Sequence, residues 1–304
     1  MNVQNPSASR GIAIQAVDLV KNYGTGSNMV HALRGVNVSF ERGKFTAIMG
    51  PSGSGKSTLM HTLAGLDSAT SGHIVFDGAD ITTMNDNQLT MLRRHKIGFI
   101  FQSFNLLPMF TAEQNILMPL TLAGDKPDRA WFDLLVETLG LKQRLNHRPN
   151  ELSGGQQQRV AIARALITKP KLVFADEPTG NLDSVSSAEV LGFLKRSVNE
   201  LGQTIVMVTH DAVAASYADR AIVFADGQIV ADESNPTAET MNELLMAERE
   251  RATRTAVTST RADTLARLAG VEDVPNLPIT DAPLPPAGRT GTIRHARAAA
   301  QHTR

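Results

Sequence analysis

Cysteine is absent from all 304 residues, so disulfide bonds and thiol chemistry are excluded. This absence is compatible with a cytosolic setting. Neither sign of charge is in excess, because 30 lysines and arginines balance 30 aspartates and glutamates. No global field therefore attracts the chain to nucleic acid, and we expect no nucleic-acid partner.

Long apolar stretches are also lacking. No run reaches the roughly 18 apolar residues that a membrane-spanning helix needs, and the polar segment Met1–Gly11 lacks the apolar core of a signal peptide. If the protein serves a membrane process, we expect the spanning parts on a separate chain. Hydrophobic residues make up 42% of the sequence, which suits one domain of about 200–250 residues plus a further segment, or two small domains.

Short β-type runs alternate with helical patterns from residue 12 to about residue 235. Expected strands cover Ile12–Leu19, Val36–Phe40, Phe45–Met49, Ile97–Phe101, Leu172–Ala175, Thr204–Val208 and Ala221–Phe224. Expected helices cover Lys56–Ala64, Trp131–Leu139, Gln156–Ile167 and Ser184–Leu201. This alternation predicts an α/β core built on a parallel sheet with crossover helices. Strands are scarce between residues 103 and 168, so we expect a helical subdomain inserted there.

The ends of the chain have a different composition. We expect a flexible N-terminus over 1–11, one domain over 12–250, and a largely disordered Ala/Pro/Arg-rich tail over 251–304. From Arg249 onward the chain has nine arginines, no lysine and five acids. The tail is expected to be a solvated extension or, if it lies beside a membrane, a weak contact with an anionic surface.

The strongest chemical signal lies between an expected strand and an expected helix, and it has the pattern of a phosphate-binding loop. The loop consists of Gly50, Pro51, Ser52, Gly53, Ser54, Gly55, Lys56, Ser57 and Thr58. Its glycines allow backbone N–H groups to surround phosphates, and the helix N-terminus adds partial positive charge. Lys56 supplies a full charge to the β- and γ-phosphates, and the Ser57 hydroxyl can bind Mg²⁺. The alternative, a Gly/Ser turn with an exposed lysine, does not account for the flanking strand and helix.

A pair of carboxylates, Asp176 and Glu177, follows the apolar run Leu172–Ala175. α/β folds place ligands at the carboxyl ends of their strands. Asp176 is suited to hold Mg²⁺ through water, and Glu177 to orient and polarise an attacking water. Acids that follow an apolar strand are common at protein surfaces, so this assignment depends on the phosphate loop.

A third motif, Ser153-Gly154-Gly155-Gln156, opens the helix that ends near Ile167. It could be only a serine N-cap, but a helix N-terminus of this kind is also an anion site. A helix of about a dozen residues is about 18 Å long, which tends to hold the serine away from the phosphate loop of the same chain. A second copy of the chain is the alternative source of this serine.

Together these motifs resemble those of ABC transporter nucleotide-binding domains, over roughly Ile12–Ser234. The resemblance implies a P-loop NTPase core with a mixed, largely parallel sheet, an ABC-type β-subdomain and an inserted helical subdomain. It further implies ATP and Mg²⁺ as cofactors, and hydrolysis of ATP by two copies of the chain arranged head to tail.

The resemblance also implies roles for single residues. Gln102 is similar to the glutamine that senses Mg²⁺ and the attacking water and contacts the membrane partner. The segment Asn181–Asp183 is similar to the loop that crosses the dimer interface. His210 is similar to the histidine that contacts the γ-phosphate, although it could be only a neighbour of a helix N-cap at Asp211. Tyr23 stands where the family stacks an aromatic ring on adenine, although it could be an ordinary surface tyrosine.

Two stretches, Ile48–Met60 and Phe101–Pro108, resemble the macrolide-export and lipoprotein-release branch of the family. In that branch the ATPase drives mechanical work through a membrane protein with few spanning helices. The resemblance therefore implies an integral permease on a separate chain and a peripheral location on the cytoplasmic face of the membrane. Apolar residues after Gln102 are expected either to receive this permease or to fill the subdomain core. An amino-acid importer, or an ABC ATPase without a membrane partner, is the alternative.

Overall fold

A computed structural model describes residues 11–268. The chain divides into two compact units, Met1–Thr253 and Arg254–Arg304, of which the first contains both sheets. The expected flexible N-terminus lies outside the described residues except for Gly11, as does the expected tail from residue 269 onward. Within residues 11–268, no helix is both long enough and apolar enough to cross a membrane.

The central element is a six-stranded sheet with the strand order β10-β9-β3-β8-β7-β6. Its strands are β3 (Phe45–Met49), β6 (Ile97–Phe101), β7 (Leu172–Asp176), β8 (Ile205–Val208), β9 (Arg220–Ala225) and β10 (Gln228–Ser234). Every neighbouring pair is parallel except β10 with β9, which is antiparallel. All residues of β3 and β8 are buried, as expected for central strands covered on both faces. The predicted mixed, largely parallel sheet is confirmed.

A second, antiparallel sheet has the strand order β2-β1-β4-β5. It consists of β1 (Ile12–Tyr23), β2 (Val30–Glu41), β4 (Ser71–Phe76) and β5 (Ala79–Asp80). Strands β4, β5 and β10 were not predicted from the sequence. Fully or partly exposed positions outnumber buried ones in β4 and β10, so neither has the continuous apolar run that revealed the central strands.

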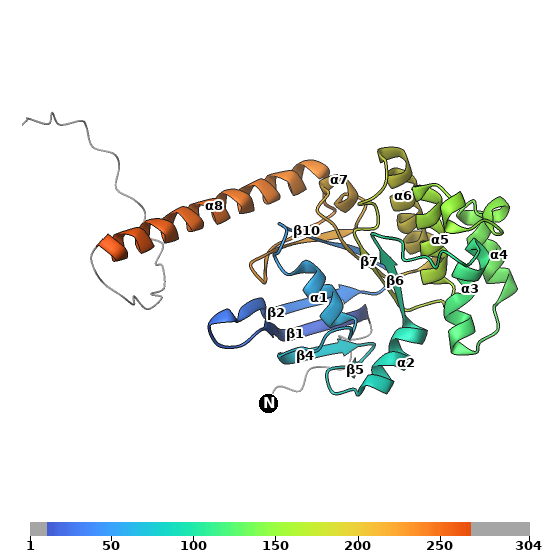
Figure 1. Ribbon diagram of the computed structural model, residues 1–304, viewed down its shortest axis with the longest axis horizontal. Helices are drawn as coiled ribbons and strands as arrows, with labels where there is room; N and C mark the ends of the chain where they lie inside the picture. Colours follow the sequence, from blue (N-terminus) through green and yellow to red (C-terminus); the bar gives the residue numbers. More distant parts are fainter. Residues whose placement is uncertain (1–10, 269–304) are drawn as a thin grey trace, which may run out of the picture. The chain divides into compact units, whose positions relative to one another are not determined.

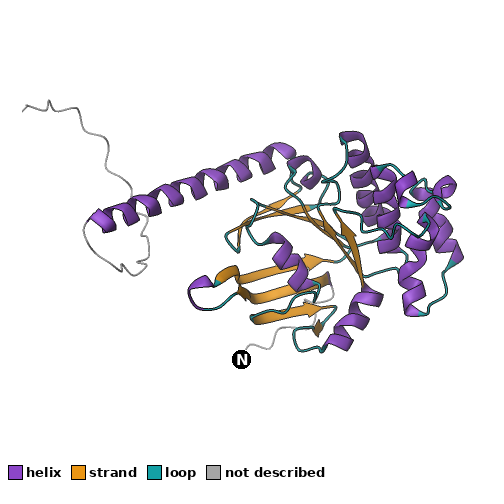
Figure 2. Ribbon diagram, viewed as in Figure 1, coloured by secondary structure: helices purple, strands orange, loops and turns teal. Residues whose placement is uncertain are grey.

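Among the described residues, eight α-helices accompany the two sheets (Figures 1 and 2). They are α1 (Lys56–Leu63), α2 (Asp86–Lys96), α3 (Ala112–Ala123), α4 (Arg129–Thr138), α5 (Gly154–Leu166), α6 (Ser184–Leu201), α7 (Ala212–Ala215) and α8 (Ala238–Leu268). Short 3₁₀ turns cover Gly26–Asn28, Lys142–Arg144 and Pro149–Glu151. The described stretch 103–168 contains α3, α4 and α5 and no strand.

Two apolar clusters hold the layers together. In β3, Phe45 and Met49 belong to a cluster that includes residues of α3, α4, α5 and α6, whereas Ile48 belongs to the other cluster. That second cluster contains Leu59 and Met60 of α1 and residues of β1, β2 and β4. The alternation follows from the two-residue period of a strand. Helix α1 is therefore packed between the two sheets, and its N-terminus follows the end of β3.

Helix α8 differs from the expected chain. It continues to Leu268, whereas the composition predicts a largely disordered tail over 251–304 in which only 255–270 could form a short helix. Residues 238–268 contain no glycine or proline and are rich in alanine, leucine, glutamate and arginine, which are strong helix formers. Helix propensity therefore extends α8, although these residues have no periodic apolar face from which a helix would be predicted. Residues 251–268 are helical, so the helix is longer than the short one that the sequence allowed.

Candidate functional site

The phosphate-binding loop turns tightly between β3 and α1. Gly50 has φ +149°, and a Cβ there would lie 1.9 Å from the carbonyl oxygen of Phe224. Gly55, the N-cap of α1, has φ +103°, and a Cβ there would lie 2.5 Å from the carbonyl oxygen of Ala32. Only glycine fits at these two positions. The backbone of the loop is thereby free to approach a ligand closely.

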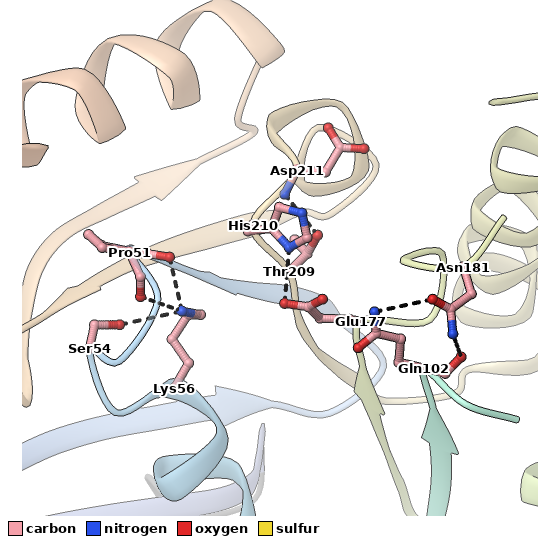
Figure 3. Close-up of polar contacts among 10 residues, drawn as sticks. Pro51, Ser54, Lys56, Gln102, Glu177, Asn181, Thr209, His210 and Asp211 are labelled. Atoms are coloured by element: carbon pink, nitrogen blue, oxygen red, sulfur yellow. Dashed lines mark hydrogen bonds and ion pairs between the residues drawn. The ribbon is translucent and has the colours of Figure 1, made fainter. Parts of the chain in front are cut away.

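Lys56 bends back into this loop. Its Nζ donates to the carbonyl oxygens of Gly50, at 2.9 Å, and Pro51, at 2.7 Å, and lies 3.5 Å from Oγ of Ser54 (Figure 3). Burial lowers the pKa of Lys56, while the charges of Glu177 and Asp176 act in the opposite direction. The ammonium group is thus held by neutral acceptors that lack a full negative charge. An anion in the loop would supply that charge.

A cavity of about 670 Å³ opens beside the loop, a size typical of sites for small ligands. Its wall comes from the loop, from β2 and from two turns at the strand ends. The lining residues are Tyr23, Met29, Val30, His31, Ala32, Arg34, Ser52, Gly53, Ser54, Gly55, Lys56, Ser57, Thr58, Glu177, Asp226 and Gly227. The cavity therefore brings Tyr23, most of the phosphate loop and Glu177 together.

The two carboxylates lie at the end of β7. Burial raises the pKa of Asp176, although the charges of His61 and Lys56 act against this. A carboxylate in this environment is stabilised by a nearby cation. Glu177 has φ +44°, in the left-handed region, and its N–H donates to the carbonyl oxygen of Val208 at 2.9 Å. This turn places the Glu177 side chain in the cavity wall.

His210 follows β8 and faces Glu177. Its Nδ1 lies 3.0 Å from Oε1 of Glu177, as the dashed line in Figure 3 marks. Thr209 donates its N–H to the carbonyl oxygen of Ile48 at 3.1 Å, which fixes the chain just before the histidine. Asp211 caps α7 through its side chain. His210 is thus next to a helix N-cap and also in contact with Glu177.

Gln102 follows β6 and pairs with the loop after Glu177. Nδ2 of Asn181 donates to the carbonyl oxygen of Gln102 at 3.0 Å, and Nε2 of Gln102 lies 3.5 Å from Oδ1 of Asn181 (Figure 3). A Cβ on Gly180 would lie 2.7 Å from Nε2 of Gln102, so glycine permits this approach. The Gln102 side chain is directed to Asn181 rather than to Ser57.

Ser153 and Gln156 form a capping box at the start of α5. Oγ of Ser153 accepts from the Gln156 N–H at 3.3 Å, and Oε1 of Gln156 accepts from the Ser153 N–H at 3.1 Å. Gly155 packs against the start of α6, because a Cβ there would lie 2.8 Å from Oγ of Ser186. None of the residues 153–156 lines the cavity that contains Lys56.

Asp183 is the N-cap of α6. Its side chain accepts hydrogen bonds from the N–H groups of Val185 and Ser186, at 3.0 and 2.9 Å, and from the Ser186 hydroxyl. The hydrogen bonds from Ser186 hold the pKa of Asp183 below its ordinary value. Asp183 does not line the cavity either, so the structure separates Ser153 and Asp183 from the phosphate loop of the same chain.

Two buried polar side chains of α5 were missed by the sequence analysis. Nε2 of Gln158, which is fully buried, donates to the carbonyl oxygen of Pro178 at 2.6 Å. The guanidinium of Arg164 donates to the carbonyl oxygens of Phe104, at 2.7 Å, and Asn105, at 2.5 Å. Both Phe104 and Asn105 have positive φ. Helix α5 therefore holds the turn after Glu177 and the turn after Gln102. Gln158 and Arg164 stand among apolar residues in the sequence of α5, and this pattern could have indicated buried polar side chains.

The expected metal ligands do not form a cluster of acidic side chains. Among the described residues, no group of three or more histidines or acids is arranged to hold a metal ion. The expected set is instead Ser57, Asp176 and Gln102, which offers oxygen donors of the kind that Mg²⁺ prefers. A site of this kind holds Mg²⁺ through few protein groups together with water and phosphate oxygens.

The buried strand β3, the glycine loop with its lysine, and the carboxylates at the end of β7 define a P-loop nucleotide-binding domain. The sequence model of the family described as "ABC transporter" matches residues 33–180. The chain is 48% identical over 221 residues to the "Lipoprotein-releasing system ATP-binding protein LolD" of Geobacter metallireducens, covering 72% of this chain and 98% of the relative. The chain belongs to the ABC transporter family of ATP-binding proteins.

Further comparisons agree with this family. The chain is 50% identical over 220 residues to the "Macrolide export ATP-binding/permease protein MacB" of Syntrophobacter fumaroxidans, covering 71% of this chain and 31% of the relative. It thus spans about a third of that relative's length. The dimeric, post-hydrolysis structure of the ATP-binding cassette MJ0796 bound to ADP and Pi is 40% identical, with a TM-score of 0.67, covering 73% of this chain and 98% of that one.

The comparisons confirm the predicted family, the fold class and the enzyme class: the protein binds and hydrolyses ATP. They also confirm a likeness to the lipoprotein-release and macrolide-export branch rather than to amino-acid importers. The printed names describe ATP-binding parts of transporters and dimeric cassettes.

Proposed function

We propose that this chain is the ATPase subunit of a transporter and works as a head-to-tail pair with two shared ATP sites. The observation that carries the proposal is the incomplete cavity. Lys56 and Glu177 line it, whereas Ser153 and its glycines, which form an anion site at the start of α5, do not. A second copy would bring its Ser153 to the phosphates held by Lys56. The dimeric cassette MJ0796, at 40% identity, supports this arrangement.

The residues on one side of the site fit ATP with Mg²⁺. Lys56 would exchange the carbonyl oxygens of Gly50 and Pro51 for phosphate oxygens, which carry the charge that the carbonyls lack. The Ser57 hydroxyl and the Asp176 carboxylate would hold Mg²⁺, and Gln102 would join them on leaving Asn181. Mg²⁺ supplies positive charge that stabilises the transferred phosphoryl group.

Glu177 is proposed as the catalytic carboxylate. It lines the cavity at the end of β7, and its backbone turn and its contact with His210 fix its orientation. From that position Glu177 orients and polarises the attacking water, and His210 contacts the terminal phosphate. Asp183, at the start of α6, faces the second copy in this arrangement.

The partner is proposed to be an integral permease on a separate chain, which holds the ATPase at the cytoplasmic face of the membrane. A groove of about 410 Å³ between α2, β6, α3 and α5 suits such a contact. Its apolar lining includes Phe99, Phe101, Met118 and Leu122, and Arg164 lies in its wall. Arg164 also holds the turn after Gln102, so the groove and the nucleotide site share one element. The relatives support a permease of the lipoprotein-release or macrolide-export type.

Mixing two inactive variants tests the shared site. Lys56→Ala removes the phosphate ligand, and Ser153→Arg blocks the anion site at the start of α5. A heterodimer of the two variants retains one intact composite site, so we expect ATPase activity to return to a substantial fraction of the wild-type rate. Each variant alone should be inactive, and unfolding curves should show that both are folded. Heterodimers that form but hydrolyse no more ATP than either parent would contradict the proposal.

A further inference from the structure

Lys21 is a buried lysine beside the nucleotide cavity to which the proposed function gives no role. Its relative exposure is 7%. Its Nζ donates to Oδ1 of Asp67 at 2.6 Å and to the carbonyl oxygen of Ser68 at 2.7 Å. A buried ammonium group is costly unless it is paired, and these two acceptors compensate that cost. Asp67 lies in the turn that follows α1, the helix that the phosphate loop begins.

Tyr23 shares this carboxylate. Its hydroxyl donates to Oδ2 of Asp67 at 2.5 Å, so the two oxygens of one carboxylate hold Lys21 and Tyr23 together. Residues 21 and 23 lie two apart on β1 and therefore point to the same face. Nζ of Lys21 lies 4.8 Å from the centroid of the Tyr23 ring, within the range of a cation–π contact.

The ring is fixed but accessible. Tyr23 is 41% exposed and lines the cavity next to Thr58 and Met29. The ammonium lies over the ring, and the exposed part of Tyr23 contributes to the cavity wall, where a ligand can reach it. Burial opposes ionisation of Asp67, but the hydrogen bonds from Lys21 and Tyr23 hold its pKa below the ordinary value. The carboxylate therefore stays charged at neutral pH and keeps both partners.

We propose that Lys21 and Asp67 are positioning residues that hold the Tyr23 ring as a preformed platform for the adenine base. This inference rests on the proposed ATP site, in which Tyr23 stacks on the base. Fixing the ring before binding removes the entropy cost of ordering it in the complex. The turn after α1 carries Asp67, so the base platform is tied to the helix that carries the phosphate loop.

Binding of ADP compared with inorganic pyrophosphate separates base contacts from phosphate contacts without hydrolysis. Calorimetric titration in Mg²⁺ is the measurement. Lys21→Met should weaken ADP binding roughly fivefold, the size expected when one side chain must be ordered on binding, and should change pyrophosphate binding less than about twofold. Lys21→Arg keeps the charge and the donors, so it should retain most of the affinity. Equal weakening of ADP and pyrophosphate would overturn the inference.

Lys169 provides a matched control in the helical subdomain. Its Nζ donates to Oδ2 of Asp128 at 2.8 Å and lies 5.5 Å from the centroid of the Trp131 ring, so a lysine, a carboxylate and an aromatic ring also meet here, at an exposed place away from the cavity. Lys169→Met should leave both affinities unchanged. If Lys21→Met does not fold, Asp67→Asn replaces it. Loss of the Asp67 charge weakens the hydrogen bonds that hold both Lys21 and Tyr23.

A double-mutant cycle with Tyr23→Ala tests whether Lys21 acts through the ring. Lys21→Met should have no further effect on ADP binding when Tyr23 is already alanine. An equal effect in both backgrounds would overturn the inference while leaving the base platform in place. If Tyr23→Ala itself leaves ADP binding unchanged, the proposed adenine site fails, and the inference fails with it. These outcomes distinguish failure of the positioning role of Lys21 from failure of the proposed adenine site.

Discussion

Nδ1 of His210 lies 3.0 Å from Oε1 of Glu177, across the ends of the neighbouring strands β8 and β7. The Glu177 N–H also donates to the carbonyl oxygen of Val208, two residues before His210. Backbone and side chain of the acidic residue are thus both fixed by one neighbouring strand and the turn that follows it. These contacts hold Glu177 in the cavity wall that it shares with Lys56 and the phosphate loop.

Replacing Glu177 by glutamine should separate binding from hydrolysis. The amide has nearly the same size and keeps an acceptor for His210, but it is a far weaker base. Glu177→Gln should bind ATP with unchanged affinity and hydrolyse it about 100-fold more slowly or worse, as expected on loss of a general base. Single-turnover hydrolysis and nucleotide titration measure the two effects. Near-normal hydrolysis by the folded variant would refute the catalytic assignment.

Replacing Gly50 by alanine tests whether the tight phosphate loop requires glycine, and the same change at Gly140 is the control. A Cβ at Gly50 would meet the carbonyl oxygen of Phe224 at 1.9 Å, whereas at Gly140, which has φ +63°, no heavy atom lies within 4 Å. Gly50→Ala should lower the free energy of unfolding by about 3 kcal/mol or more and abolish ATP binding. Gly140→Ala should cost only the backbone strain, about 1–2 kcal/mol, and leave binding intact. Urea unfolding curves measure both, and equal losses would contradict this account.

Leu122 tests the proposed contact with a permease. Its side chain is 69% exposed and lines the groove between α2, β6, α3 and α5. Leu122→Glu places a charge on an apolar contact, so the variant should lose most of its activity with the permease and keep the ATPase activity of the isolated subunit. Leu134→Glu, at a 46% exposed position of α4 outside the groove lining, is the control. Equal loss of both activities in Leu122→Glu would indicate a core defect instead.

Asp77 joins the two sheets electrostatically and should make stability depend on pH. It forms ion pairs with Arg42 and Lys171, and Nζ of Lys96 lies 3.7 Å from its Oδ2. Burial acts to raise the pKa of Asp77, but the hydrogen bonds from Lys171 and Arg42 hold it below the ordinary value. A depressed pKa in the folded state stabilises the protein above the unfolded-state pKa, which is about 3.9. This contribution is lost as the pH falls through the folded-state value.

Asp77→Asn should therefore lower the free energy of unfolding by about 1 kcal/mol at pH 7, a magnitude typical of partly exposed ion pairs. The difference from the wild type should shrink below about pH 4, as the unfolded-state carboxyl becomes protonated. Thermal unfolding at a series of pH values measures this. The exposed Asp133, replaced by asparagine, is the control and should show little difference at any pH. A constant deficit for Asp77→Asn from pH 7 to pH 3 would exclude the electrostatic explanation.

The central strands and the three motifs could be predicted because each depends on neighbouring residues. The run before Asp176 is apolar throughout, the buried run before Gly50 contains a single polar residue, Thr46, and the phosphate loop is contiguous. Strand β10 and helix α2 escaped prediction for lack of such a run. Helix α2 nevertheless begins with a capping box, in which Asn85 and Gln88 satisfy each other's N–H groups. That local signal was present in the sequence and was not used.

Other parts of the site could not be read from neighbouring residues. Asp67 meets Lys21 and Tyr23 from more than forty positions away. The role of Tyr23 was predicted from family resemblance, whereas its partner Asp67 could not be predicted. Gln102 was expected near Mg²⁺, and its present partner, Asn181, is 79 positions away. Contacts of this kind depend on strand order and loop packing, which local patterns do not encode.

The two buried polar side chains of α5, Gln158 and Arg164, have a genetic consequence. In the proposed pair, α5 offers its first residues to the nucleotide of the other copy, while Gln158 and Arg164 hold two turns around the nucleotide of its own copy. A lesion at Gln158 or Arg164 that also displaced the start of α5 would therefore impair both nucleotide sites of a mixed pair. In a cell that makes normal and altered chains in equal amounts, most pairs contain at least one altered chain. Alleles at these two positions should accordingly be dominant, whereas an allele confined to Tyr23 should be recessive.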